Sequence, residues 1–390
     1  MKGLAVTNIT DFIFQSVADI RFGAGCLSQL SEIMTDKFSA KSVLIVTDRG
    51  LLQAGVIDGV LRILEASNLA IVIFDQVVAD PPESVVLAAA EFAKDCDVVI
   101  GIGGGSSMDS AKLAATLCMG EQTLESMYGV DKVTSSRKPL IQIPTTAGTG
   151  SEVTPISIVT TGKSSKAGVV SPKLYADIAI LDPTLLLGLP AHITAETGVD
   201  AMVHAIEAYT SKIKKNPISD HLATRALTLL AEHLPQAYME GKNLQHRGAT
   251  MLGAMLAGQA FANAPVAGVH ALAYPLGGIY HLAHGLTNAL MLPHVLRYNL
   301  NGAAQLYAEL ADLLITDCSG STEAKAASFI EYMTDLCAKV GLNKRLRDVG
   351  IPQDGLQELA EQAMLQTRLL QNNPQEINLA DALAIYQQAW

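Results

Sequence analysis

The spacing of apolar residues changes along the chain. Between residues 42 and 143, short runs rich in valine and isoleucine alternate with stretches in which apolar residues recur every three or four positions. The runs are typical of buried strands, and the longer stretches are typical of amphipathic helices. These patterns predict strands at residues 42–47, 70–74, 97–102 and 140–143, and helices at about residues 57–66, 83–93 and 108–117. A further strand is predicted within residues 12–22.

Such an alternation favours a mostly parallel sheet that is covered by helices on both faces. The strand signals nearly vanish after Asp182-Pro183, and residues 185–190 are interpreted as a connector. Long helical periodicities follow, for example at about residues 220–234 and 323–340. We therefore expect an α/β domain over residues 1–188 and an all-helical domain over residues 189–390.

Residues 248–296 contain no Asp, Glu, Lys or Arg. A charge-free run of this length could form a membrane hairpin. The run nevertheless holds four histidines, two of which are His281 and His294, together with asparagines and prolines. Polar groups inside a bilayer are costly and rare. We interpret the run as the buried centre of the helical domain and expect no membrane partner.

The composition narrows the choice of partners and of compartment. The net charge of −11 argues against binding to nucleic acid or to an anionic membrane surface. The 5 cysteines are scattered singly and form no C-x-x-C motif. An odd, unpatterned set is typical of reduced thiols in a cytoplasmic protein.

A glycine-rich turn follows the strand predicted at residues 97–102. A strand, a glycine turn and a helix form an arrangement that binds phosphate, because the backbone can approach the ligand and the helix N-terminus carries free N–H groups. The sequence Gly101-Ile102-Gly103-Gly104-Gly105-Ser106 does not complete G-x-G-x-x-G, since serine occupies the last position. An acidic residue at a strand end, Asp48, precedes the turn instead of following it. This is not the standard dinucleotide unit, and a plain tight turn is the alternative.

A second loop rich in hydroxyl groups, residues 144–152, follows the strand predicted at residues 140–143. Its threonines and glycines suit contacts with phosphate or ribose. The alternative is an ordinary turn of Ser and Thr residues.

One carboxylate and three imidazoles form the most informative set in the chain. Asp200 and His204 are four residues apart on a predicted helix, so both side chains lie on one face, roughly 5–6 Å apart at Cβ. His270 and His284 lie in the apolar run. Together they match the ligands of a divalent transition metal with room left for a substrate oxygen. Buried histidines that only satisfy hydrogen bonds are the alternative.

In combination, these blocks resemble the iron-containing (group III) alcohol dehydrogenase family. The stretches that carry the resemblance are residues 103–112, 144–152, 197–207, 270–285 and 292–294, and they span nearly the whole chain. The resemblance implies an N-terminal α/β dinucleotide-binding domain and an all-helical C-terminal domain, with the active site in the cleft between them.

The resemblance also implies roles for individual residues. Asp200, His204, His270 and His284 become the metal ligands, Asp48 faces the adenine ribose, and Lys166 lies near the nicotinamide ribose. Phe261 matches an aromatic residue of the substrate pocket. The remaining positions that match cofactor contacts are Gly104, Gly105, Ser106, Thr145, Thr146 and Thr149.

One position departs from the family pattern. Many members carry a histidine four residues after the third metal ligand, whereas this chain has Tyr274. Tyrosine has an ordinary pKa near 10 and is a poorer acid or base at neutral pH. We expect Tyr274 to relay a proton or to shape the pocket, with His281 as a second relay candidate.

These observations predict a metal-dependent alcohol dehydrogenase and aldehyde reductase that uses NAD. The expected metal is Fe²⁺, with Zn²⁺ as an alternative, and the expected substrates are small primary alcohols and aldehydes. The rivals in chemistry are a hydroxyacid-oxoacid transhydrogenase or maleylacetate-type reductase, which needs a basic pocket, and a zinc-dependent glycerol dehydrogenase or dehydroquinate synthase-like enzyme. A non-catalytic nucleotide-binding protein is the rival from another class. We expect a homodimer or a higher homo-oligomer.

Overall fold

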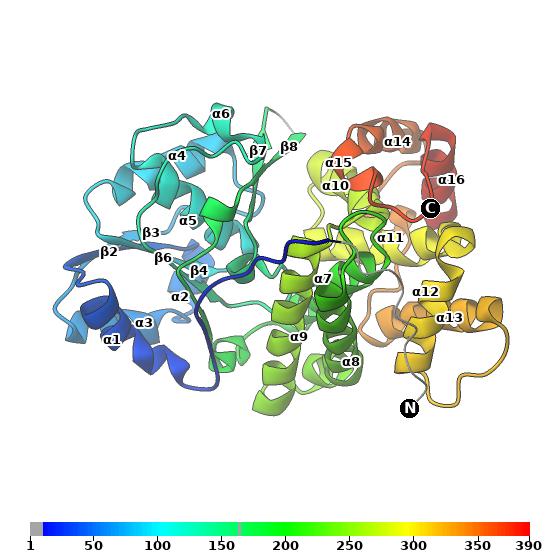
Figure 1. Cartoon of the computed structure of the whole chain (residues 1–390), viewed down its shortest axis with the longest axis horizontal. Coiled ribbons are helices and arrows are strands. Elements are labelled where there is room, and N and C mark those ends of the chain that lie inside the picture. Colours follow the sequence, from blue (N-terminus) through cyan, green and yellow to red (C-terminus); the bar gives the residue numbers. More distant parts are fainter. Residues whose placement is uncertain (1–10, 163–164) are drawn as a thin grey trace.

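The computed structural model describes residues 11–162 and 165–390. Its elements fall into a sheet region and a helical region that lie side by side (Figure 1). Strands and short helices occupy the chain up to Leu181, and long helices occupy it from Ala191 onward. The domain boundary expected near residue 188 falls in the connection between the strand that ends at Leu181 and the helix that begins at Ala191.

The larger sheet has six strands in the order β1-β9-β6-β4-β2-β3, and all neighbours are parallel. Parallel strands require crossovers, and helices supply them on both faces. The strands are β1 (Ile20–Phe22), β2 (Ser42–Val46), β3 (Ala70–Phe74), β4 (Val98–Gly103), β6 (Leu140–Pro144) and β9 (Ile178–Leu181). The crossover helices include α3 (Asp58–Ala66), α4 (Glu83–Ala93) and α5 (Gly105–Leu117), with the shorter α1 (Leu30–Glu32), α2 (Arg49–Gln53) and α6 (Leu124–Met127) beside them.

A smaller sheet extends this region toward the helices. It has the order β5-β8-β7, in which β5 and β8 are parallel and β7 and β8 are antiparallel. Its strands are β5 (Gly129–Val130), β7 (Ile156–Thr161) and β8 (Ser165–Val170). In Figure 1 the hairpin of β7 and β8 lies at the border with the helical region.

Two predictions about the sheet region need correction. The strand predicted within residues 12–22 forms only over β1, because the register with β9 pairs three residues and ends at Ile20. The preceding segment instead reaches the helices, where the Gln15 N–H donates to Asn263 at 2.7 Å. The helix predicted from residue 108 begins at Gly105, because the extended Gly104 caps it and Ser106 and Ser107 enter its first turn.

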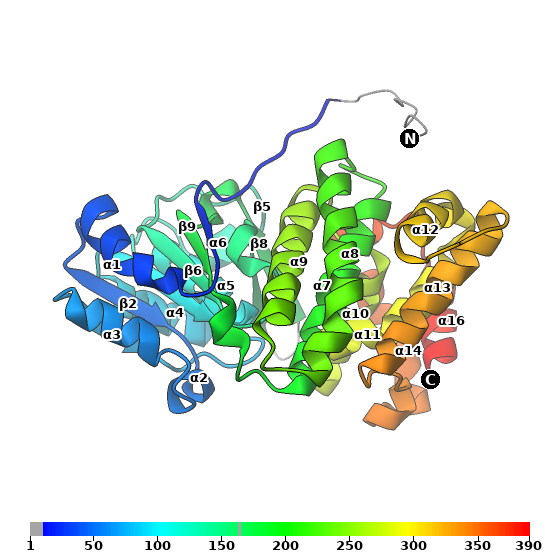
Figure 2. The same ribbon diagram turned by 90° about the horizontal axis from the view of Figure 1, so that it is seen from below.

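The helical region is built around three long antiparallel neighbours, which Figure 2 shows between the sheet and the remaining helices. These are α7 (Ala191–Thr210), α8 (Pro217–Met239) and α9 (Leu244–Asn263). Beyond them lie α10 (Gly268–Tyr280), α11 (His284–Tyr298), α12 (Leu300–Leu314), α13 (Thr322–Lys339), α14 (Leu356–Met364), α15 (Thr367–Leu370) and α16 (Leu379–Ala389).

The charge-free run forms most of α9, all of α10 and most of α11, and many of its side chains are buried. No single helix in the described part of the chain is long and apolar enough to cross a membrane. The pair α9 and α10, bent by 105°, meets the length and composition criteria only when its two helices are taken together.

Candidate metal and cofactor site

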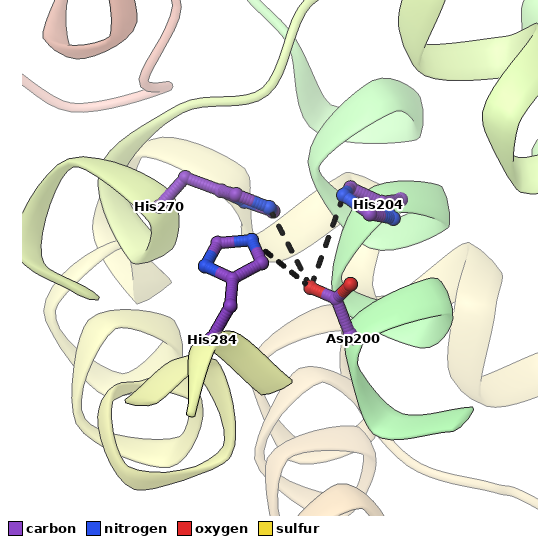
Figure 3. Close-up of side chains that lie close together, drawn as sticks. All are labelled: Asp200, His204, His270 and His284. Carbon is purple, nitrogen blue, oxygen red and sulfur yellow. Dashed lines mark ion pairs between the residues drawn. The ribbon is translucent and has the colours of Figure 1, made fainter. Parts of the chain in front are cut away.

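The predicted metal ligands come from three helices and converge on one point (Figure 3). Asp200 and His204 lie one turn apart in the middle of α7, and both are buried. His270 lies in the first turn of α10, and His284 is the first residue of α11. The break between α10 and α11 therefore places the last two ligands opposite α7.

The distances within this set fit a single ion. The Asp200 Oδ1 atom lies 3.8 Å from Nε2 of His204, 3.8 Å from Nε2 of His270 and 3.5 Å from Nε2 of His284. Ligands about 2.1 Å from a tetrahedral metal are about 3.4 Å apart from one another. The donor atoms, all within 4.8 Å of each other, thus fit a divalent cation with nitrogen and oxygen ligands.

The protonation states are those that metal binding needs. Burial lowers the pKa of His204 to about 3 and that of His284 to about 4, so both imidazoles are neutral at pH 7. For Asp200, burial opposes ionisation, but the three histidines and the Asn288 amide together bring the pKa below its usual value. A neutral imidazole and an ionised carboxylate are the ligand forms of these side chains.

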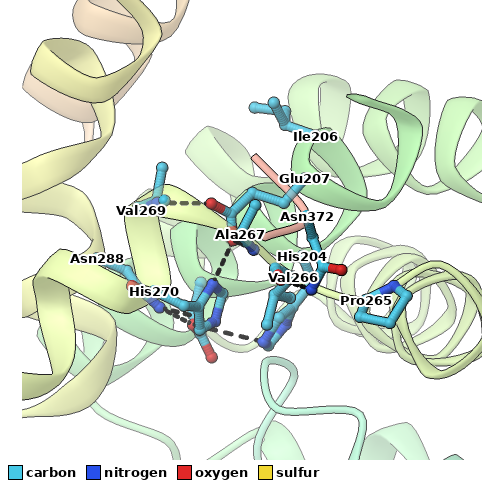
Figure 4. A network of polar contacts seen from close by, with 12 residues as sticks. His204, Ile206, Glu207, Pro265, Val266, Ala267, Val269, His270, Asn288 and Asn372 are labelled. Atoms are coloured by element: carbon cyan, nitrogen blue, oxygen red, sulfur yellow. Dashed lines mark hydrogen bonds and ion pairs between the residues drawn. The ribbon is translucent and has the colours of Figure 1, made fainter. Parts of the chain in front are cut away.

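A buried carboxylate, Glu207, fixes the third ligand from behind (Figure 4). Its Oε2 atom lies 2.7 Å from Nδ1 of His270, and its two oxygens also accept the N–H groups of Ala267 at 2.9 Å and Val269 at 2.6 Å. Accepting the Nδ1 proton leaves the Nε2 lone pair of His270 free for a metal. Glu207 also accepts hydrogen bonds from N–H groups at the start of α10. These groups have no acceptor within the helix, because no helical turn precedes them.

Asn288, one turn into α11, supports the carboxylate ligand. Its side-chain N–H donates to Asp200 Oδ1 at 2.6 Å. The same amide nitrogen lies 3.2 Å from Nε2 of His270. The amide therefore fixes the carboxylate in the orientation that faces the histidines.

The glycine turn brings the sheet region to the same place. β4 ends at Gly103, Gly104 is extended, and α5 starts at Gly105. A Cβ at Gly105 would lie 2.9 Å from the Thr149 side chain, so only glycine allows the two loops to meet. Gly105, Ser106 and Thr149 line a shared pocket, with the N-terminus of α5 facing it.

The hydroxyl-rich loop is in backbone contact with the helical region. A Cβ at Gly148 would lie 2.6 Å from the Cβ of Thr197, on α7 just before Asp200. A Cβ at Gly150 would lie 2.5 Å from the Cα of Gly258 on α9, and Gly150 has a left-handed φ of 60°. These contacts fix the hydroxyl-rich loop against α7, which carries two of the predicted ligands, and against α9. The other two threonines predicted to contact the cofactor, Thr145 and Thr146, lie in the same loop, directly after β6.

The two charged residues predicted to contact the cofactor lie on the sheet side. Asp48 follows β2 and caps α2 by accepting the Leu51 N–H at 3.0 Å. Lys166 on β8 forms an ion pair with Asp80, and both line the shared pocket. The role of Lys166 beside the nicotinamide ribose stays a prediction.

The shared pocket has a volume of about 320 Å³ and contains all four predicted metal ligands. Phe261 of α9 lines it and stacks on His204, with ring centroids 4.3 Å apart. Further apolar residues of the lining are Val130, Ile156, Ile158, Val170, Ile213, Pro265 and Val266. An apolar lining of this kind keeps water away from the metal ligands.

The two relay candidates lie in different places. α10 continues through Pro275, so Tyr274 stays on the same face as His270, and its ring centroid lies 5.8 Å from that of His284. Tyr274 lines the pocket, and burial raises its pKa to about 12. His281 is an exposed cap at the end of α10, with a φ of 55°, and it is not among the residues of the pocket.

Sequence reasoning left out several residues of the site. Glu207 follows Asp200 and His204 at spacing i, i+4, i+7, so helical periodicity could have revealed it. Two pocket residues, Lys214 and Arg368, lie in segments without a motif, and only the fold brings them to the pocket.

Comparison with known proteins places the chain among characterised relatives. The family model "Iron-containing alcohol dehydrogenase" matches residues 18–183, and the model "Fe-containing alcohol dehydrogenase family, C-terminal" matches residues 194–390. The long-chain-alcohol dehydrogenase 1 of Geobacillus thermodenitrificans is 38% identical over 98% of this chain and 97% of its own length. The NAD-dependent methanol dehydrogenase of Bacillus methanolicus is 33% identical over 90% of this chain and 93% of its own.

A solved structure extends the comparison to the fold. The crystal structure of a 1,3-propanediol oxidoreductase superposes with a TM-score of 0.94 at 36% identity, and the match covers 98% of this chain and all of that one. The sheet region followed by the helical region is therefore the fold of these relatives.

Proposed function

The chain belongs to the iron-containing alcohol dehydrogenase family, and within the NAD(H)-linked activity of that family we propose that it interconverts small primary alcohols and aldehydes. The observation that carries the proposal is the convergence of three imidazoles and one carboxylate in a pocket that also contains the glycine turn. A convergence of this kind requires a functional reason, since it concentrates polar groups in an apolar interior.

We propose that Asp200, His204, His270 and His284 hold one Fe²⁺ ion, and that Zn²⁺ can take its place. A ligand set without thiolate suits both metals, and zinc generally binds nitrogen and oxygen sites more tightly. A divalent metal supplies Lewis acidity, which favours the ionised form of an alcohol. The neutral imidazoles leave that acidity largely undiminished.

The residues of the chain hold the reactants in place. The N-terminus of α5 and the loop around Thr149 bind the phosphates and ribose of the cofactor, and Phe261 packs against the hydrocarbon part of the substrate. Exclusion of water and fixed contact between donor and acceptor carbons supply much of the rate enhancement in hydride transfer.

We propose that Asp48 accepts hydrogen bonds from the adenine ribose and repels a 2′-phosphate, so that NAD is preferred over NADP. Its place after the carboxyl end of β2, an inner strand of the parallel sheet, supports this role. An Asp48→Gly variant should lose the preference, as measured by kcat/KM for the two cofactors.

We propose that Tyr274, not His281, influences proton transfer. Its hydroxyl is protonated at neutral pH, and burial raises its pKa further, to about 12, so it acts as a hydrogen-bond donor in the pocket. Removing the hydroxyl in Tyr274→Phe should change the pH profile of kcat and leave metal content unchanged.

The deciding experiment measures NADH oxidation by purified protein that has been loaded with Fe²⁺ without oxygen, or with Zn²⁺. Butanal and pentanal should be reduced, and 1-butanol should be oxidised more slowly at neutral pH, since oxidation releases a proton. Failure with every alcohol and aldehyde at full metal content would favour a non-catalytic nucleotide-binding protein.

Two further expectations accompany this function. We propose that the protein works in the cytoplasm, which the free state of all five cysteines supports. We also propose a homodimer or higher homo-oligomer, to be measured by sedimentation.

A further inference from the structure

The pocket has an uneven distribution of charge. Three cationic side chains line it, namely Lys166, Lys214 and Arg368. Lys166 is neutralised by its ion pair with Asp80. Within residues 11–162 and 165–390, the side chains of Lys214 and Arg368 have neither a hydrogen bond nor an ion pair. Two cationic groups of the lining are thus available to a ligand.

Hydrogen bonds tie together the two segments that carry these residues. The carbonyl of Arg368 accepts the side-chain amide of Asn372 at 3.0 Å, and the carbonyl of Asn372 accepts the N–H of Lys212 at 2.8 Å. The segment after α15 is therefore tied to the loop that contains Lys214. Their side chains face the pocket from two segments that the fold fixes to each other.

The guanidinium of Arg368 lies against the β7–β8 hairpin. A Cβ at Gly168 would lie 3.7 Å from Nη2 of Arg368 and 3.3 Å from Cδ1 of Ile158. The glycine therefore leaves room for the guanidinium beside Ile158. Arg368 is half-buried, and its N–H donors are not among the buried unpartnered atoms of the described residues, so they are open to the pocket and available to a ligand that replaces water.

Apolar side chains lie beside both the guanidinium of Arg368 and the predicted metal ligands. Ile158 lies beside the guanidinium, while Phe261 stacks on His204 at 4.3 Å between centroids. Both line the same pocket. The lining therefore combines a predicted metal site, a hydrocarbon surface and a cationic group.

We propose that the aldehyde substrate carries a carboxylate at the end away from its carbonyl, and that Arg368, with Lys214 beside it, binds this carboxylate. The inference rests on the proposed function, because the carbonyl must be directed to the metal ligands. A planar carboxylate matches the two parallel N–H donors of a guanidinium. The apolar lining then contacts the methylene groups in between.

The negative net charge of the protein does not prevent a carboxylate from binding in the pocket. A protein with net charge −11 repels anions at long range, but salt screens that repulsion beyond about 8–10 Å. Recognition inside the pocket depends on the nearby groups, and among the described residues Lys214 and Arg368 are lining cations without an ion-pair partner. A buried carboxylate that finds a guanidinium avoids most of its desolvation cost.

The test compares aldehydes that differ only at the far end. Butanal and pentanal are paired with 4-oxobutanoate and 5-oxopentanoate, and kcat/KM is measured for the wild type, Arg368→Gln and Arg368→Lys. The matched control is Arg297→Gln, which removes an exposed arginine of α11 that does not line the pocket.

The wild type should prefer at least one oxo acid over the neutral aldehyde of equal length. Arg368→Gln should lower kcat/KM for the oxo acids by about 10- to 100-fold, as expected for a lost charge-assisted hydrogen bond, mainly through KM. The neutral aldehydes should change by less than about 3-fold, since truncation leaves the apolar lining intact. Arg368→Lys should keep part of the preference, and Arg297→Gln should keep all of it.

The outcomes separate this inference from the proposed function. Reduction of neutral aldehydes without any preference for oxo acids would overturn the inference alone, as would an Arg368→Gln variant that lowers both classes equally. Reduction of neither class by metal-loaded wild type would overturn the proposed function. Metal content and circular dichroism of each variant establish that it is folded.

Discussion

The helical wall of the pocket, formed by α7, α10 and α11, presents its functional groups as side chains. The sheet wall, formed by the glycine turn and the loop at residues 144–152, presents them as backbone. On the helical side, ligands separated by up to 84 positions, from Asp200 to His284, meet through imidazole and carboxylate groups. On the sheet side, a glycine turn and a glycine-rich loop offer N–H groups and lie close to their neighbours because they lack a Cβ.

The two walls are therefore sensitive to different kinds of substitution. A metal site depends on the orientation of each ring, so it depends on groups such as Glu207 that hold the rings. A backbone site depends on the shape of a loop, so it is damaged by added volume instead of lost hydrogen bonds.

Removing one ring should abolish the helical wall's function. His270→Ala should lose the metal and lower turnover by more than the roughly 10- to 100-fold that is typical of residues behind the ligands. Metal analysis and kcat/KM are the measurements, and NADH affinity should be unchanged because the sheet wall is intact. His221→Ala, at an exposed position of α8, is the control. A His270→Ala protein with full metal content would contradict the ligand assignment.

Adding one methyl group should damage the sheet wall. The new Cβ in Gly148→Ala would lie 2.6 Å from the Thr197 side chain and 2.9 Å from its carbonyl oxygen, so the loop must shift. NADH affinity, measured by fluorescence, should fall by about 10-fold or more, consistent with an overpacking cost of about 1–3 kcal/mol. Gly188→Ala adds a methyl group in open space and should change nothing. The contrast fails if Gly148→Ala loses metal but keeps NADH.

Replacing the carboxylate behind His270 should have a smaller effect. Glu207→Gln keeps the volume but presents an amide N–H₂ to donors that now need an acceptor. Metal affinity should fall by about 10- to 100-fold, while NADH binding stays as in the wild type. Glu331→Gln, at an exposed position of α13, is the control for the loss of one charge. Unchanged metal affinity would show that Glu207 only caps α10.

The two walls should respond to pH with opposite signs in the metal-free protein. Burial lowers the pKa of His204 to about 3 and of His284 to about 4, so between these values and 6.5 the unfolded state binds protons that the folded state does not. Stability therefore falls as the pH drops through this range, by up to about 1.4 kcal/mol per pH unit for each group.

A buried carboxylate of the sheet wall gives the folding stability the opposite dependence on pH. Burial raises the pKa of Glu152, the last residue of the hydroxyl-rich loop, to about 7, so between pH 4.5 and 7 the folded state holds a proton that the unfolded state releases. This contribution is lost as the pH rises. Glu152→Gln should therefore raise the Tm of metal-free protein more at pH 8 than at pH 5. An equal shift at both values would contradict the argument.

Much of the sheet region could be predicted because its signals are local. The strand at residues 70–74 and the helix at residues 83–93 coincide with β3 and α4, since period-two and period-3.6 patterns are set within a few residues. The segment before β1 could not be predicted, because its partner is Asn263 of α9 and not a strand. Its apolar residues fit either environment.

The site could be predicted to the extent that its residues share a helix face or a motif. The spacing of Asp200 and His204 identifies them as candidates. His270 and His284 are identified by their place in an apolar run. No sequence motif surrounds Arg368. The tertiary fold, which brings its short helix beside the β7–β8 hairpin, places it at the pocket. Substrate preference is therefore the property that the sequence pattern conveys least.

The contact between Gly150 and Gly258 limits how the two regions can be exchanged. Neither position accepts a side chain, because a Cβ at Gly150 would meet Gly258 Cα at 2.5 Å, and a Cβ at Gly258 would meet Gly150 Cα at 2.8 Å. Each region thus supplies one of the two glycines, and the close contact forms only when both are present. In a chimaera, a sheet region grafted onto a foreign helical region would join correctly only if both brought this glycine. The two regions are separate in architecture but are not interchangeable parts.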